Sequence, residues 1–148
     1  MAIRIRSKNK NSALHLYTRM MRATNVVSEK MHLHLRDHRL SISQFGVLEA
    51  LYHLGPLCQK DLGKKILKTS GNITLVIDNL EKRSLVTREK DPDDRRRFTI
   101  NLTPKGNDLI KKIFPSHSKI AESIFSVLDA EEQNRLGELL KKLGMKNM

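Results

Sequence analysis

Residues 59–102 constrain the fold of this chain more than any other stretch. Residues 59–66 and 71–83 are typical of two short helices separated by a tight turn. Residues 85–89 and 98–102 are typical of half-buried strands, and the charged segment between them predicts a hairpin tip. Such a helix pair can place its second helix in the major groove of DNA, and an arginine-tipped hairpin can reach a neighbouring minor groove. The stretch therefore predicts a winged helix-turn-helix.

Helical patterns also precede this stretch. Residues 12–37 carry apolar side chains at helical spacing, which predicts a long first helix. Ser43 is a candidate N-cap for a second helix, which we expect to end at Leu54 because Gly55 and Pro56 follow it.

The C-terminal part has its own start and stop signals. Residues 103–104, a Thr-Pro pair, predict a helix start, and Pro115 is expected to kink or break that helix. Asp129 and Glu132 have the spacing of a capping box, which predicts a last helix ending near Gly144.

These elements predict a mainly α fold with a two-stranded β wing. We expect an N-terminal arm and helix over residues 1–40, a winged helix-turn-helix domain over residues 41–102 and C-terminal helices over residues 103–148. The terminal helices hold more apolar surface than the winged domain needs, so we expect them to form a dimerisation domain with a second copy of the chain. A compact monomer that hides part of this surface is the alternative.

The charge balance favours a polyanionic partner. The chain of 148 residues has 28 Lys and Arg against 16 Asp and Glu, a formal net charge of +12. It has no apolar run long enough for a transmembrane helix and no signal-peptide core, so we expect no membrane partner. A single cysteine excludes an intrachain disulfide framework and fits a reducing cytoplasm. With 4% aromatic residues and no Trp, the chain is poorly supplied for stacking on RNA bases.

The second short helix has a predicted buried seam of Ile73, Val76, Ile77 and Leu80. Three side chains opposite this seam are candidates for base recognition. Asn72 can pair with adenine, Thr74 can reach a base or a phosphate, and Leu75 can cover a thymine methyl group.

The residues just before them are candidates for phosphate binding. Ser70 and Gly71 lie at the helix N-terminus, where free backbone N–H groups favour an anion, and Lys68 can follow the DNA backbone. The alternatives are that Ser70 and Asn72 only cap the helix, and that Lys68 is a solvated charge.

Three motifs of the chain are specific: residues 91–96, Asp-Pro-Asp-Asp-Arg-Arg, residues 102–106, Leu-Thr-Pro-Lys-Gly, and residues 78–86 at the exit of the second short helix. Together with the order of elements over nearly the whole chain, they resemble the MarR family of bacterial transcriptional regulators, which usually has Gly in place of Ser84. The resemblance implies a homodimeric repressor whose terminal helices interlock and whose two wings straddle an operator. It also implies release from DNA by a small, often phenolic or quinone-like, molecule. Residues 113–117 and 71–74 look closest to regulators of quinone and phenolic stress.

Matching the family motif assigns roles in the wing. The resemblance implies that Asp94 braces Arg96, that Arg96 enters the minor groove, and that Arg95 and Arg97 contact phosphates. A narrow, A·T-rich minor groove concentrates negative potential and so suits an arginine. The alternative is an ordinary hydrophilic hairpin tip.

An inducer pocket near the hinge has four candidate residues: Tyr17, Met21, Met31 and Phe45. The helical spacing of such residues is explained at least as well by core packing.

The histidines and the cysteine suggest further sites without completing one. His34 and His38 have the i,i+4 spacing that places two imidazoles on one helical face, but no cysteine or carboxylate completes a metal site, so we expect neither metal nor cofactor. Cys58 can be a redox switch because Lys60 is nearby, or a small buried packing residue.

These observations predict a sequence-specific DNA-binding transcriptional regulator and not an enzyme. Its partners would be double-stranded DNA, a second copy of the chain and a small-molecule inducer. The inducer, or oxidation of the protein, would release the regulator from its operator. Two-fold symmetry predicts a pseudo-palindromic operator with half-sites about 10 bp apart. The alternative is a non-specific or architectural nucleic-acid-binding protein that uses charge alone. An enzyme is disfavoured because no metal triad, phosphate loop or activated nucleophile is present.

Overall fold

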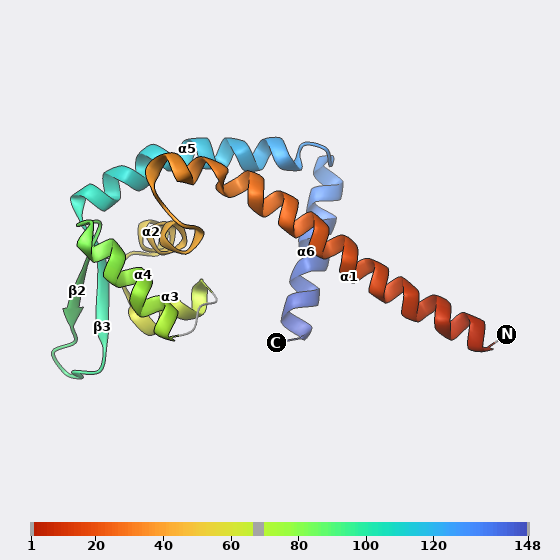
Figure 1. Ribbon diagram of the computed structural model, residues 1–148, viewed down its shortest axis with the longest axis horizontal. Helices are drawn as coiled ribbons and strands as arrows, with labels where there is room; N and C mark the ends of the chain where they lie inside the picture. The colour runs from red at the N-terminus through yellow and green to blue at the C-terminus, as the bar shows by residue number, and fades with distance from the viewer. Residues whose placement is uncertain (1, 67–69, 148) are drawn as a thin grey trace. The chain divides into compact units, whose positions relative to one another are not determined.

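The structure, a computed structural model, describes residues 2–66 and 70–147, and the side chains of these except residues 2–10, 70 and 71. Its elements in chain order are α1 (Ala2–His32), the 3₁₀ helix η1 (Leu33–His38), α2 (Ile42–Leu54), β1 (Leu57–Cys58), α3 (Gln59–Lys65), α4 (Ser70–Lys82), β2 (Val86–Lys90), β3 (Phe98–Leu102), α5 (Pro104–Phe125) and α6 (Ala130–Lys146). Figure 1 labels the helices and the two wing strands.

The chain divides into two compact units. The terminal-helix unit consists of Met1–Met31 and Ser118–Met148, and the central unit consists of His32–His117. The helix α5 contributes residues to both units.

The central unit holds the hydrophobic core. The seam predicted for α4 is confirmed: Ile73, Ile77 and Leu80 are at most 2% exposed, and Val76 is half-buried and packs against the core. The other buried hydrophobic side chains are Leu35, Leu40, Phe45, Val47, Leu48, Leu51, Leu62, Leu85, Val86, Ile100, Ile110 and Ile113.

The wing is an antiparallel hairpin within a three-stranded sheet of order β1-β3-β2. In the hairpin Val86 pairs with Leu102 and Lys90 pairs with Phe98, and the hairpin lies beside α4 (Figure 1). The third strand, β1, pairs with β3 through only two residues, which is too short to show the alternation that identifies a strand in a sequence.

The helix α2 begins two residues earlier than predicted. Its N-cap is Ser41, whose Oγ accepts a hydrogen bond from the Gln44 N–H (3.1 Å), while the Gln44 Oε1 accepts one from the Ser41 N–H (2.9 Å). The prediction of Ser43 as the N-cap was wrong. A capping box needs Glu or Gln three residues after the cap, and Ser43 is followed at that distance by Gly46.

The sequence predicted that Pro115 kinks or breaks its helix, and a break does not occur, because α5 continues through Pro115 to Phe125. Proline removes one intrahelical hydrogen bond, but Ile110, Ile113 and His117 are buried along this helix on both sides of it. Tertiary packing of this face stabilises the helix across the missing bond.

The terminal-helix unit leaves much apolar surface exposed. No described residue of α6 is buried. Ala23, Val26, Val27 and Ile124 are among the residues that line a groove of about 610 Å³ on this unit. The exposed large hydrophobic side chains of the unit include Leu14, Leu16, Tyr17, Val127, Leu136, Leu139, Leu140 and Leu143.

The last helix starts as predicted. The Glu132 N–H donates to the Asp129 Oδ1 (2.8 Å) and the Asp129 N–H donates to the Glu132 Oε1 (3.1 Å), which confirms the capping box. Among the described residues, no helix has an apolar segment long enough to cross a bilayer.

Candidate nucleic-acid interface

The outward face of α4 carries the three predicted base-reading side chains. Asn72, Thr74 and Leu75 are exposed, and 60% of the Leu75 surface is accessible to solvent. Lys68 lies outside the described residues, as do the side chains of Ser70 and Gly71, although the backbone of both begins α4. An exposed leucine on a helix whose opposite face is buried leaves apolar surface available to a partner.

The wing tip is folded by its own aspartates. The Asp94 Oδ1 accepts a hydrogen bond from the backbone N–H of Arg96 (3.0 Å), and the Asp91 Oδ1 accepts one from the N–H of Asp93 (2.9 Å). The Arg97 N–H donates to the Asp94 carbonyl oxygen (3.0 Å). These aspartates therefore fix the backbone of the tip.

The three consecutive arginines of the tip are all exposed. Arg95, Arg96 and Arg97 follow Asp94 directly, so the turn that holds their backbone also sets where their side chains leave the wing. Like charges this close repel one another, and an anion relieves the repulsion.

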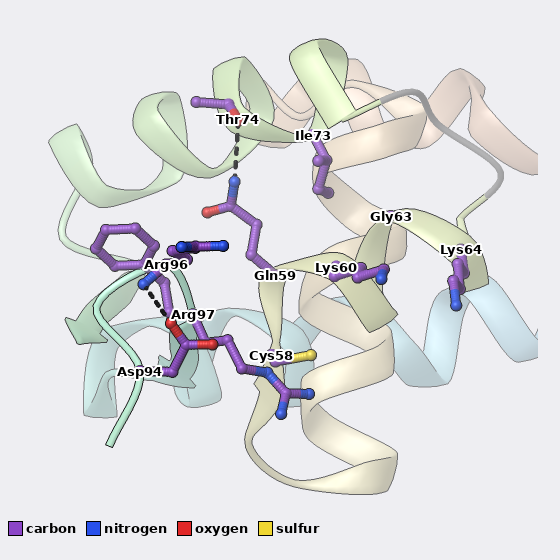
Figure 2. Close-up of a pocket in the computed structure, with 11 residues that line it drawn as sticks. Cys58, Gln59, Lys60, Gly63, Lys64, Ile73, Thr74, Asp94, Arg96 and Arg97 are labelled. Atoms are coloured by element: carbon purple, nitrogen blue, oxygen red, sulfur yellow. Dashed lines mark hydrogen bonds between the residues drawn. The ribbon is translucent and has the colours of Figure 1, made fainter. Parts of the chain in front are cut away.

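A cavity of about 670 Å³ lies between α3, α4 and the wing tip (Figure 2). Four cationic side chains and one carboxylate, that of Asp94, are among its lining. The positive excess suits a phosphate backbone. The lining residues are Cys58, Gln59, Lys60, Gly63, Lys64, Ile73, Thr74, Asp94, Arg96, Arg97 and Phe98.

One hydrogen bond crosses this cavity from α3 to α4. Gln59, the first residue of α3, donates from its Nε2 to the Oγ1 of Thr74 (2.9 Å). Figure 2 shows the Gln59 side chain extending from the start of α3 toward Thr74.

An ion pair links α4 to the wing. The Arg88 guanidinium on β2 lies 2.7 Å from the Asp78 carboxylate on α4, and it also lies 5.7 Å from the centre of the Phe98 ring on β3. Arg88 thus contacts both the recognition helix and the opposite strand of the wing.

The C-terminal end of α4 is tied to the loop after η1. Arg83 donates from Nη1 to the Arg39 carbonyl oxygen (2.6 Å) and from Nη2 to the His38 carbonyl oxygen (3.1 Å). The Arg83 carbonyl oxygen in turn accepts a hydrogen bond from the Lys105 Nζ (3.0 Å) on α5. Three segments distant in the sequence therefore meet at the end of the recognition helix.

The turn between α4 and the wing has a left-handed residue. Ser84 has φ 61°, a conformation in which any side chain is strained, and its carbonyl oxygen accepts a hydrogen bond from the Thr103 Oγ1 (2.6 Å). The Thr103 N–H donates to the Leu85 carbonyl oxygen (3.1 Å). At Gly106 a Cβ atom would collide with that same Leu85 carbonyl oxygen, so only glycine fits there.

The histidines do not lie as the i,i+4 spacing suggested. His34 and His38 belong to a 3₁₀ helix, in which residues four apart do not share a face, so the predicted arrangement of this pair was wrong. His34 instead shares a hydrogen bond of 2.9 Å with His117, between Nε2 and Nδ1. Within residues 11–66 and 72–147, whose side chains are described, no three or more His, Cys, Asp or Glu side chains are placed to hold a metal ion.

His117 lies in an apolar setting. Its side chain is buried, and its ring centre is 4.4 Å from that of Phe45. Burial lowers the pKa of His117 below the usual histidine range, and the nearby charges of His34 and His32 lower that pKa further.

The remaining candidate residues are distributed over both units. Tyr17, Met21 and Met31 belong to the terminal-helix unit, and Phe45 lies in the core of the central unit at 2% exposure. Cys58 is half-buried, precedes α3 and lines the cavity.

Several residues at this surface could not be recognised from the sequence. Nothing in the sequence distinguishes Arg83 and Arg88 from the other charged residues, because their partners lie on other elements. Gln59 is a polar residue at a helix start, and its partner is 15 residues away. No local spacing rule pairs such residues, because the fold sets their contacts.

Comparison with known proteins agrees with this architecture. The model of the MarR family matches residues 40–98. Over 133 residues the chain is 41% identical to the uncharacterised HTH-type transcriptional regulator YkoM of Bacillus subtilis, covering 90% of this chain and 86% of YkoM. It is 38% identical to the HTH-type transcriptional regulator MhqR of Bacillus subtilis, covering 90% of this chain and 92% of MhqR.

Among solved structures, one is of BpsR of Bordetella bronchiseptica, whose DNA binding is regulated by 6-hydroxynicotinic acid. The BpsR chain is 28% identical to this chain, and the match covers 88% of this chain and 98% of the BpsR chain with a TM-score of 0.80. Both relatives and this structure match nearly the full length of the chain. The chain belongs to the MarR family of winged helix-turn-helix transcriptional regulators, which bind DNA and catalyse no reaction.

Proposed function

We propose that the chain is a homodimeric repressor that binds a pseudo-palindromic operator and is released from it by a small ligand. The observation that carries this proposal is the cation-lined cavity between α3, α4 and the wing tip. The exposed face of the recognition helix and the arginines of the wing both border it, so one duplex can contact both.

The contacts to DNA divide by chemistry. Asn72, Thr74 and Leu75 read base edges in the major groove, because amide, hydroxyl and methyl groups distinguish base pairs there. Arg96 enters the minor groove, while Arg95 and Arg97 bind phosphates. Ser70 and Gly71 at the start of α4, with Lys68 two residues earlier in the sequence, complete the phosphate contacts.

A second copy of the chain covers the apolar surface of the terminal helices. The groove on the terminal-helix unit and the exposed leucines of α6 support this, since a surface of this kind is rarely left open to solvent. Residues 1–40 and 103–148 then form the dimerisation domain. A two-fold dimer binds two half-sites about 10 bp apart.

The ligand is a small aromatic compound of the phenolic or quinone class. The sequence resemblance supports this class, and the regulation of the related BpsR by 6-hydroxynicotinic acid supports release by an aromatic ligand. Because bacterial operators lie in the cytoplasm, the protein acts there.

Selection of bound sequences from a random duplex pool, at about physiological salt, tests the proposal. Charge-only binding is weakened under these conditions, so we expect an inverted repeat to be enriched. Enrichment of no motif, with binding that disappears as salt is raised, would contradict sequence-specific repression and favour a non-specific binder. The enriched duplex then serves to screen ligands by the release of bound protein.

A further inference from the structure

The hydrogen bond between Gln59 and Thr74 connects a half-buried side chain to the outward face of the recognition helix. Gln59 lies at the start of α3, and Thr74 is exposed on α4 (Figure 2). The donor and acceptor are 2.9 Å apart, which is an ordinary hydrogen-bond length. Because the Thr74 hydroxyl can both donate and accept, the pair stays hydrogen-bonded even if the Gln59 amide turns over.

A threonine in a helix divides between two side-chain rotamers. The bond from Gln59 favours the rotamer in which the Thr74 Oγ1 faces α3, because only that rotamer can accept it. The position of the Thr74 methyl group relative to the DNA is fixed at the same time, because the methyl and the hydroxyl share the Cβ atom. A side chain that is held in one rotamer before binding loses less entropy when it meets a base edge.

Gln59 is set back from the surface that meets DNA. Its Oε1 atom is buried and has no hydrogen-bond partner among the described residues, whereas the neighbouring Lys60 is exposed. Gln59 can therefore influence base recognition through Thr74 without lying on the outward face itself.

We propose that Gln59 is a positioning residue for base recognition: its amide holds Thr74 in the rotamer that reads one base pair in each half-site. The inference rests on the proposed sequence-specific binding. It adds a specificity-determining residue on α3, outside the recognition helix and the wing.

The test compares Gln59→Met, Thr74→Val and the double variant with the unchanged protein. Each protein is titrated against a panel of duplexes that carry every single base-pair substitution in the selected operator. Met keeps the approximate volume of Gln59 without its hydrogen bond, and Val keeps the shape of Thr74 without its hydroxyl.

We expect both single variants to lose discrimination at the same base pair of the half-site, by about three- to tenfold, the value of one net hydrogen bond. The double variant should lose no more than either single variant, because the two residues act as a pair. Uniform weakening of all duplexes by Gln59→Met, or loss at a different base pair from that of Thr74→Val, would overturn the inference.

Two further variants separate positioning from charge and from stability. Lys60→Met changes a residue that lines the same cavity without a bond to Thr74, and we expect it to weaken binding to all duplexes equally. Gln59→Glu keeps an acceptor for the Thr74 hydroxyl, so it should keep the base preference while its charge beside Arg96 and Arg97 lowers overall affinity. Equal melting temperatures for Gln59→Met and the unchanged protein exclude loss of folding.

The outcomes also separate this inference from the proposed function. If the unchanged protein selects an operator but Thr74→Val leaves its base preferences intact, the positioning role is wrong and the repressor proposal stands. If the unchanged protein selects no operator, both are wrong.

Discussion

Asp78 on the recognition helix and Arg88 on the first wing strand form an ion pair whose closest atoms are 2.7 Å apart. Arg88 is largely buried, with 18% of its side chain exposed, and it also faces the Phe98 ring. The pair joins the recognition helix to the wing, the two elements that border the cationic cavity.

Breaking this pair should reduce the stability of the fold. We expect Arg88→Met to lower the free energy of unfolding by about 1 kcal/mol, because it leaves the Asp78 carboxylate without its partner. Urea unfolding measures this change. The matched control is Arg135→Met: the pair of Arg135 with Glu138 is 3.5 Å long and both side chains are about 70% exposed, so it should contribute nothing measurable. Equal losses in the two variants would contradict a special role for Arg88.

Replacing Ser84 by glycine should stabilise the protein. Ser84 has φ 61°, where a Cβ atom is strained, and glycine removes that strain. Part of the gain is offset because glycine makes the unfolded chain more flexible. The net increase in the free energy of unfolding is then about 0.5–1 kcal/mol. Thermal unfolding of Ser84→Gly shows this as a higher melting temperature. As a control, Gly55→Ala places a Cβ at φ 79° and should lower the melting temperature.

Gly106→Ala should destabilise the junction between the wing and α5. The new Cβ atom would collide with the Leu85 carbonyl oxygen and lie 3.2 Å from the Cδ2 of Leu102, so the backbone must shift. Overpacking of this kind costs about 1–3 kcal/mol, measurable by denaturant unfolding. Gly137→Ala is the matched control, since a Cβ there meets open space and alanine is the better helix former. An unchanged free energy of unfolding in Gly106→Ala would contradict this prediction, because it would mean that the backbone at the junction shifts without cost.

The buried His117 should make stability depend on pH. Its pKa is lowered in the folded state, so folding favours the neutral ring. Its contribution is complete above the unfolded pKa of about 6.5 and is lost as the pH falls below that value toward the folded pKa. We therefore expect the free energy of unfolding to fall as the pH drops below about 6.5, and to fall less steeply in His117→Phe. An identical slope in this variant would assign the effect to other groups.

The wing arginines should differ in what they contribute to operator binding. Arg95→Met should weaken all duplexes similarly and reduce the slope of log affinity against log salt by about 1, as expected for one lost phosphate contact. Arg96→Met should also reduce the preference for A·T-rich sequence beneath the wing, because a narrow minor groove attracts arginine most strongly. Binding assays at several salt concentrations, on A·T-rich and G·C-rich flanks, distinguish the two. Equal behaviour of both variants would contradict the assignment of Arg96 to the groove.

The parts of the fold that sequence predicted correctly are those fixed by local patterns. The buried seam of α4 follows from helical periodicity, and the capping box at Asp129 follows from a three-residue spacing. The error at Ser43 arose because Ser41 is the better cap, and the helix continues through Pro115 because packing stabilises it on both sides.

The contacts that join distant segments were beyond such patterns. His34 and His117 are 83 residues apart, and Arg83 reaches carbonyl groups about 45 residues away. Hydrogen bonds of this kind depend on where the backbone brings each side chain, so their partners are known only once the fold is known. The wing motif suggested that Asp94 supports Arg96, but the observed bond is made to the backbone N–H.

The alternation of buried and exposed positions along α4 has a consequence for how such proteins diversify. Ile73, Ile77 and Leu80 hold the helix in the core, whereas Asn72 and Leu75 contribute nothing to that core. We propose that these two outward residues contact bases, and on that proposal a daughter copy made by gene duplication can change them and acquire a new target sequence without passing through an unfolded intermediate. New regulons can then arise by single substitutions on one helix face while the scaffold is inherited unchanged.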